Sequence, residues 1–184
     1  GGLPIPEVRH RVTSDTAALS RGERGWVEEG VGIIQSWADH DAYPWHVMEK
    51  MDFASYEYVS QHLPDGMRML VCPSSGVFEI SSEYLLGFEG MSIMLYEDPT
   101  LVEAVFSRVG QCILDFYRNV ITLDNVAGIF QGDDLGFKTS TFLSPTHLRR
   151  LVLPWHKRYA ALAHEQGQVY WFHSCGNLSN VMDD

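Results

Sequence analysis

The stretch FHSCGN at residues 172–177 follows an apolar run and places a histidine and a cysteine two residues apart. In an extended chain, residues i and i+2 point to the same side, so His173 and Cys175 would project together from a strand end. Zinc favours imidazole nitrogen and thiolate sulfur, and a catalytic zinc site has three protein ligands plus one open position. A third ligand would be Cys72 or would lie outside this chain. The competing interpretation is an ordinary strand end without metal.

Two adjacent carboxylates, Asp133 and Asp134, form a second grouping after the apolar segment 126–131. Neighbouring carboxylates repel, so one of them would acquire a raised pKa if desolvated, which suits a general acid or base. Both are therefore candidate catalytic residues. The alternative is that one caps the following segment and the other is solvated. Lys138, a few residues later, either pairs with one of them or contacts substrate.

Other polar groups near predicted strand ends supply candidate substrate-binding residues. With Lys138 included, these candidate substrate-binding residues are Cys72, Gln131, Lys138 and Tyr84. Packing is the competing role for the aromatic residues, which include Tyr43, Trp45, Phe78 and Tyr84. The sequence has no dinucleotide-binding glycine motif, no phosphate-binding loop motif and no serine-hydrolase elbow motif.

The histidines outside FHSCGN are weaker candidates. Three of them fall on one predicted helix without the HExxH spacing of a zinc protease, so solvent-facing or capping roles are expected: His147, His156 and His164. The stretch Asp39-His40-Asp41 lies in an irregular region and is not assigned a function. Cys112 lies beside an apolar helical face and is expected to be inert packing.

Strands are expected at residues 67–72, 126–131 and 169–173, each followed by a loop and a helix. Asp98 with Pro99, and Ser144 with Pro145, have the cap-plus-proline pattern of helix starts. Ser81 or Ser82 is expected to cap a helix that runs to about Tyr96. Gly167 is expected to end the helix that follows Ser144, and Asn177 is a candidate cap for a further helix.

Residues 1–66 are rich in Gly, Pro and polar side chains and are less regular. One strand at residues 31–34 and one helix near residues 48–62 are expected there. In residues 67–184, strands alternate with amphipathic helices, which predicts an α/β fold with parallel strands. We interpret residues 1–184 as one incomplete domain, part of a (β/α)8 barrel within a larger protein. A doubly wound sheet is the alternative, and in both folds ligands bind at the carboxyl ends of the strands.

The composition is that of a globular protein, with 45% hydrophobic and 20% charged residues and a net charge of −11. Such an acidic chain is not expected to bind nucleic acid, and no apolar run approaches the roughly 20 residues of a membrane span. The three cysteines are an odd, widely spaced set, unlike a disulfide framework. A reducing cytoplasm is the expected location.

The motifs FQGDDLGF, LSPTHLRRLVLPWHKR and FHSCGN together resemble the uroporphyrinogen decarboxylase superfamily, over about residues 66–184. The resemblance rests on Asp133-Asp134-Leu135-Gly136, Ser144-Pro145, Pro154 and His173-Ser174-Cys175-Gly176. It implies a (β/α)8 barrel. In the methyltransferase branch, it implies that His173 and Cys175 are two zinc ligands, that a later cysteine is the third, and that zinc activates a thiol acceptor. A corrinoid protein or a methylated small molecule would donate the methyl group.

Two other functions stay open on the sequence. A decarboxylase of the same superfamily removes carboxylates from a tetrapyrrole, and its site must offer several cations. Here Arg149, Arg150 and Arg158 fall on a helix rather than at a strand end. The second alternative is that the chain is a non-catalytic barrel module that binds a partner. Exposed sheet edges would favour association, so a partner, a homo-oligomer or further chain is expected to cover them.

Overall fold

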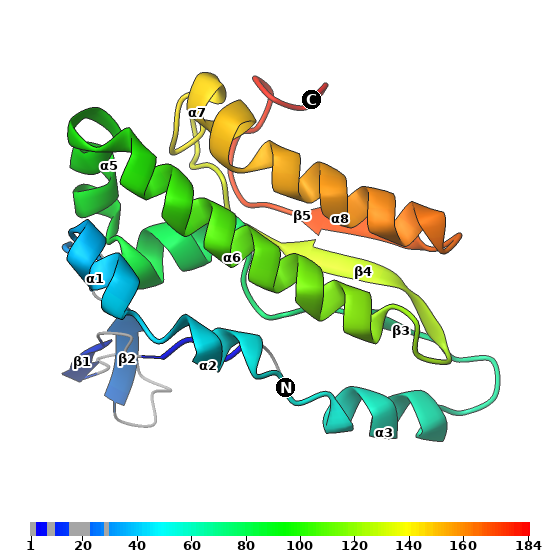
Figure 1. Ribbon diagram of the computed structural model, residues 1–184. Coiled ribbons are helices and arrows are strands. Elements are labelled where there is room, and N and C mark those ends of the chain that lie inside the picture. The colour runs from blue at the N-terminus through cyan, green and yellow to red at the C-terminus, as the bar shows by residue number, and fades with distance from the viewer. Residues whose placement is uncertain (1–2, 7–9, 15–22, 28–29) are drawn as a thin grey trace.

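The computed structural model describes residues 3–6, 10–14, 23–27 and 30–184 (Figure 1). Strands β3 (Met69–Val71), β4 (Val126–Gly132) and β5 (Val169–His173) form a parallel sheet in the order β3-β4-β5. Long helices connect the strands, as expected for right-handed crossover units. The α/β class and the parallel strands predicted from the sequence are therefore confirmed.

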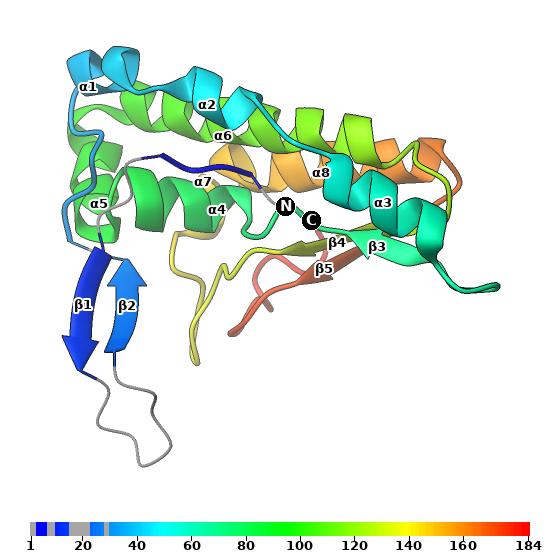
Figure 2. The same cartoon turned by 90° about the horizontal axis from the view of Figure 1, so that it is seen from below.

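Helices α6 (Pro99–Val120) and α8 (Leu153–Glu165) lie side by side on one face of this sheet (Figures 1 and 2). Their apolar faces meet Ile129 of β4 and bury large side chains, including Phe106, Tyr117 and Tyr159. Within the described chain, no helix covers the opposite face (Figure 2). Phe130 and Trp171, which are register partners on that face, remain 40% and 59% exposed. The sheet thus has one covered and one open face.

The predicted helix caps are confirmed at two starts. The Asp98 carboxylate accepts the Leu101 N–H at the start of α6, and the Ser144 hydroxyl accepts the His147 N–H at the start of α7 (Pro145–Leu151). The helix predicted from Ser144 to Gly167 is interrupted at Val152, where α8 begins. Pro154 lies in the first turn of α8 and has no N–H to donate, which favours this break. Gly167 then has φ +67°, the left-handed conformation predicted for it.

The helix predicted to start at Ser81 or Ser82 is wrong in its boundaries. A short helix α4 (Val77–Glu79) begins earlier and continues as a π-helix, η1 (Ile80–Leu85), and α5 (Phe88–Glu97) follows. The last carbonyls of a helix have no partner within the helix, so those at the end of η1 can accept N–H groups from residues 30–34. The Gly32 N–H donates to the Leu86 carbonyl and the Ile34 N–H to the Leu85 carbonyl, both at 2.9 Å.

Three further predictions about local structure are wrong. Residues 31–34 form no strand, because their N–H groups bond to the end of η1 rather than to a sheet. The region predicted as one helix at 48–62 holds two, α2 (Trp45–Glu49) and α3 (Ala54–His62). No helix follows Asn177, whose side chain accepts the Ser179 N–H in a turn.

The remaining elements are helix α1 (Trp37–Ala42) and a hairpin of β1 (His10–Ser14) and β2 (Glu23–Val27), which projects from the body (Figure 2). None of the described helices is both long and apolar enough to cross a membrane.

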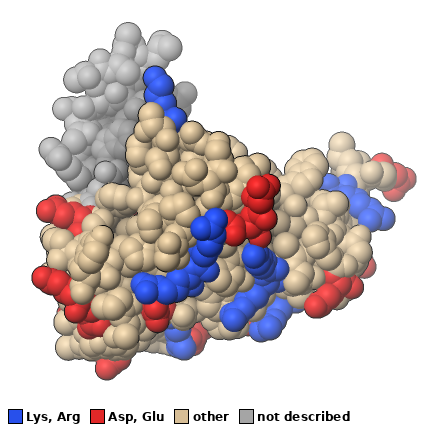
Figure 3. Space-filling model, turned by 90° about the horizontal axis from the view of Figure 1, so that it is seen from above, with Lys and Arg blue, Asp and Glu red and all other residues tan. Residues whose placement is uncertain are grey.

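Lysine and arginine side chains gather over the helical layer (Figure 3). Several of them are paired there, for example Arg150 with Glu103 at 3.2 Å and Arg118 with Asp115 at 2.9 Å. The helices that cover one face of the sheet therefore have much of the chain's positive charge on their outer surface.

Candidate metal centre at the strand ends

The ends of β4 and β5 bring three potential metal ligands together. One ligand atom each from Asp134, His173 and Cys175 lies within 4.8 Å of the other two. The Cys175 Sγ is 3.7 Å from His173 Nε2, and His173 Nε2 is 3.9 Å from Asp134 Oδ1. The Cys175 backbone N–H donates to Asp134 Oδ1 at 2.7 Å, which fixes the loop after β5 against the loop after β4.

This donor set fits zinc in its chemistry, since it combines an imidazole, a thiol and a carboxylate in one exposed cluster. The side chains of His173 and Cys175 lie close together, as the i, i+2 spacing predicted. The third member comes from the adjacent strand and not from Cys72. The Asp134 carboxylate, through a side-chain hydrogen bond and its charge, raises the pKa of Cys175. Metal binding would displace that proton.

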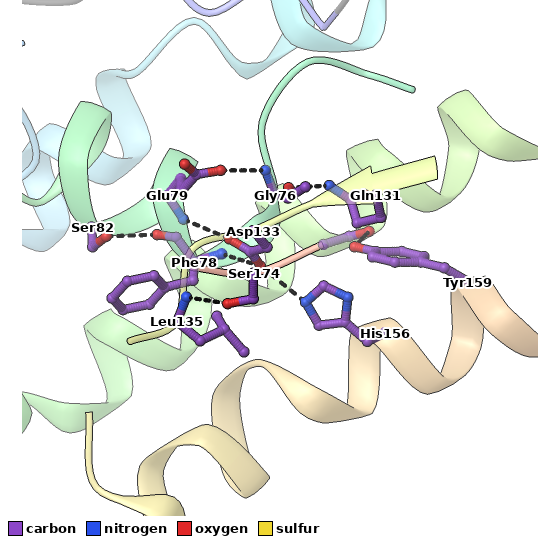
Figure 4. Close-up of polar contacts among 12 residues, drawn as sticks. Gly76, Phe78, Glu79, Ser82, Gln131, Asp133, Leu135, His156, Tyr159 and Ser174 are labelled. Carbon is purple, nitrogen blue, oxygen red and sulfur yellow. Dashed lines mark hydrogen bonds and ion pairs between the residues drawn. The ribbon is translucent and has the colours of Figure 1, made fainter. Parts of the chain in front are cut away.

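Asp133 has very different surroundings from its neighbour Asp134. Its side chain is fully buried and accepts the backbone N–H groups of Phe78 and Glu79, both at 3.0 Å (Figure 4). His156 Nε2 lies 2.9 Å from the same carboxylate. Asp133 therefore caps the N-terminus of α4, where the helix has no capping side chain of its own. Its catalytic role stays a prediction, while its contacts are those of a buried carboxyl group with a structural role.

Gly76 makes this cap possible. A Cβ at this position would overlap the Asp133 side chain, so only glycine lets the carboxylate lie directly against the first turn of α4.

His156 was missed by sequence reasoning. It is 7% exposed on α8, and its Nε2 lies against Asp133 (Figure 4). Its Nδ1 lies 2.7 Å from the Tyr170 hydroxyl. The expectation of a solvent-facing or capping histidine on one long helix is wrong for it, and His147 lies on α7 instead. A signal existed in the spacing, because His156 lies four residues after Val152 and three before Tyr159, both of which are buried.

Glu79 is a second residue that the sequence did not single out. It is partly buried, and burial followed by the charge of Asp133 raises its pKa to about 7. The Gly76 N–H, which donates to Glu79 Oε2 at 3.3 Å, opposes this shift. A carboxyl that titrates near neutrality beside a cluster of metal-ligand type is a candidate for proton transfer.

The predicted substrate-binding residues do not all reach the cluster. Gln131 is fully buried on the helix side of β4, where it accepts the Tyr117 hydroxyl at 2.7 Å. Tyr84 packs in η1 against the core. Cys72 lies after β3, and its thiol contacts the Ser74 carbonyl at 3.7 Å. Lys138 is exposed and makes no ion pair with Asp133 or Asp134.

Cys112 is buried, as predicted, and burial raises its pKa to about 11.

Comparison with known proteins agrees with this fold. The family model described as uroporphyrinogen decarboxylase (URO-D) matches residues 57–184, and the chain belongs to this family. No curated protein sequence matches it. Among solved structures, a methyltransferase from Methanosarcina mazei is similar with a TM-score of 0.56 and 11% identity. The similarity covers 92% of this chain and 48% of that one, so the chain spans about half the length of that structure.

Proposed function

We propose that this chain provides the metal-binding half of a zinc-dependent methyltransferase, which moves a methyl group from a corrinoid or another methylated donor to a thiol or related acceptor. In this proposal the chain forms part of a complete (β/α)8 barrel. The observation that carries it is the meeting of Asp134, His173 and Cys175 at the carboxyl ends of β4 and β5. Strand ends on the same edge of a parallel sheet are where barrel enzymes place their sites.

In this proposal, His173 Nε2 and Cys175 Sγ are zinc ligands, and Asp134 is a third ligand or orients the cysteine loop. Bound zinc would supply a positive charge that keeps a thiol acceptor in its nucleophilic thiolate form. The buried Asp133 and His156 fix the loop that carries Asp134.

The charges at the strand ends favour this function over decarboxylation of a tetrapyrrole. A substrate with many carboxylates needs several cations around it. Within the described residues, the carboxylates Glu79, Asp133 and Asp134 lie at this edge, whereas Arg149, Arg150 and Arg158 lie on α7 and α8. Arg149 and Arg150 are already paired, with Asp184 and Glu103.

The test is the zinc content of the full chain purified without added metal. We expect about one zinc per chain in the wild type and loss of that zinc in Cys175→Ser. Cys72→Ser is the matched control, because Cys72 lies at another strand end, and it should keep the metal.

Methyl transfer from methylcobalamin to 2-mercaptoethanol would then be assayed on the zinc-loaded complete barrel that contains this chain. Equal zinc contents in wild type and Cys175→Ser would refute the ligand assignment. Zinc binding without methyl transfer would leave the ligands in place and refute the reaction.

A further inference from the structure

A groove with a volume of about 360 Å³ lies between α6 and α8. It follows the second half of both helices, which lead to the starts of β4 and β5, so it lies at the opposite end of the sheet from the candidate metal centre. Its apolar lining consists of Leu114, Ala161 and Leu162. Helices form the outer ring of a (β/α)8 barrel, so we expect this groove to stay open to solvent in a complete one.

The α6 side of the groove presents two hydrogen-bond donors that one carboxylate holds in place. Gln111 Nε2 and Arg118 Nη1 both donate to Asp115 Oδ1, each at 2.9 Å. Because they share this oxygen, the amide of Gln111 and the guanidinium of Arg118 lie close together. Arg118 is exposed, and a guanidinium has several N–H donors, of which this ion pair uses only part. The remaining donors are free for a ligand.

The α8 side presents a second guanidinium, which an aromatic ring orients. Arg158 Cζ lies 4.4 Å from the centre of the Trp155 ring. Trp155 is itself fixed, because its ring packs directly against Gly110 of α6. Gln111 follows Gly110 in α6, which brings its amide to the level of Trp155 and Arg158. Stacking uses the face of the guanidinium and leaves its N–H edge free. No carboxylate in the described part of the chain forms an ion pair with Arg158.

The charges around the groove favour a ligand with one negative charge. Helices α6, α7 and α8 carry six of the 13 basic residues of the chain and three of its 24 acidic residues (Figure 3). Arg118 is already paired with Asp115, so Arg158 is the guanidinium whose charge a ligand would neutralise. Glu165 also lines the groove, seven residues after Arg158 on α8 and thus about 10 Å further along the helix. At that separation, solvent ions screen much of its repulsion of an anion beside Arg158.

We propose that the groove between α6 and α8 binds a small organic acid, in which one carboxylate is attached to an apolar group. The carboxylate accepts N–H groups from Arg158 on one side and from Arg118 and Gln111 on the other. Guanidinium groups match the planar geometry of a carboxylate, and such charge-assisted hydrogen bonds are the stronger ones. The apolar group packs on the apolar lining of the groove. This site is separate from the candidate metal centre and does not depend on the proposed function.

The test is an NMR titration of the ¹⁵N-labelled full chain with phenylacetate as the probe. We expect saturable shifts of the Gln111 side-chain amide and of the Arg158 Nε–H signal, with a Kd on the order of 1 mM. Acetate carries the charge without the apolar group, and benzyl alcohol has the apolar group without the charge. Each should therefore bind about tenfold more weakly or worse. Phenyl phosphate tests phosphate esters as an alternative class of ligand.

Arg158→Gln removes the guanidinium that has no carboxylate partner and should weaken phenylacetate binding on the order of tenfold. Arg108→Gln is the matched control, because Arg108 is an exposed arginine of α6 that pairs with Glu49 and does not line the groove. It should bind phenylacetate like the wild type.

Four outcomes would overturn the inference. They are the absence of saturable shifts at Gln111 and Arg158, unchanged affinity in Arg158→Gln, and benzyl alcohol or phenyl phosphate binding as tightly as phenylacetate. The fourth is an equal loss of affinity in Arg108→Gln, which would show general attraction to the basic helical layer instead of a site.

Discussion

At the scale of single residues, two adjacent aspartates do different work. Asp133 is buried between the first turn of α4 and His156, whereas Asp134 is partly exposed beside His173 and Cys175. The sequence alone shows two adjacent aspartates and does not distinguish their surroundings. The difference arises because successive residues after a strand point to opposite sides, so one carboxylate faces the helices and the other faces the open edge.

Asp133→Ala should therefore act on stability. It leaves the N–H groups of Phe78 and Glu79 and the His156 ring without their buried partner, which should lower the free energy of unfolding by about 3–5 kcal/mol. Asp134→Ala, on the partly exposed side, should change stability by less than about 1 kcal/mol and weaken zinc binding instead. Urea unfolding and zinc titration of both variants check this. Equal losses of stability would contradict the division of roles.

At the scale of elements, regular parts of the chain were predictable and long-range contacts were not. Strands β4 and β5 and the starts of α6 and α7 follow from apolar runs and from local cap residues that lie beside them in sequence. The start of α4 was missed because its cap is Asp133, which is 55 residues away from Phe78. A helix whose cap comes from another strand carries no local signal.

The same distinction applies to the candidate site. His173 and Cys175 were found because the i, i+2 spacing is local, and the family resemblance singled out the same pair. Asp134 as their neighbour depends on the register of β4 against β5, in which Gly132 pairs with His173. Glu79 and His156 approach through tertiary packing, so their significance emerges only in the folded chain.

The packing of α6 against α8 gives a prediction at this scale. Gly110 lies directly against the Trp155 ring, and the Tyr159 hydroxyl donates to its carbonyl at 3.0 Å. Gly110→Ala should push Trp155 away and lower the free energy of unfolding by about 1–3 kcal/mol. Gly90→Ala, in α5, has room for the methyl group and should raise it by up to about 1 kcal/mol. Thermal unfolding of the two variants measures these changes in stability. A Gly110→Ala variant more stable than the wild type would contradict the close packing of Gly110 against Trp155.

At the scale of the whole molecule, the sheet is half covered. Parallel sheets usually have both faces buried, yet one face here exposes Phe130, Val169 and Trp171. Among the described residues, no further strand pairs with the outer edge of β5. The carboxyl groups of Asp133 and Asp134 lie at the strand ends, and the chain as a whole has a net charge of −11. We therefore expect the open face of the sheet to be the part of the surface that most favours association with another chain.

We expect the isolated chain to self-associate through this face at micromolar concentrations. Trp171→Lys places a charge at its centre and should shift the chain toward monomer. Tyr96→Lys, on α5, replaces a side chain that is more exposed (84%) but away from the sheet, and should not change association. Sedimentation velocity distinguishes the species. A chain that is monomeric throughout would show that the open face does not drive association.

The π-helix η1 has a mechanical consequence for the molecule as a whole. Its last carbonyls accept the N–H groups of Gly32 and Ile34, and its first turn continues from the helix that carries Glu79. Residues 30–34 therefore cannot open without disturbing η1, although they belong to no sheet. We therefore expect residues 30–34 and the rim of the metal centre to open and close together on the timescale of hydrogen exchange.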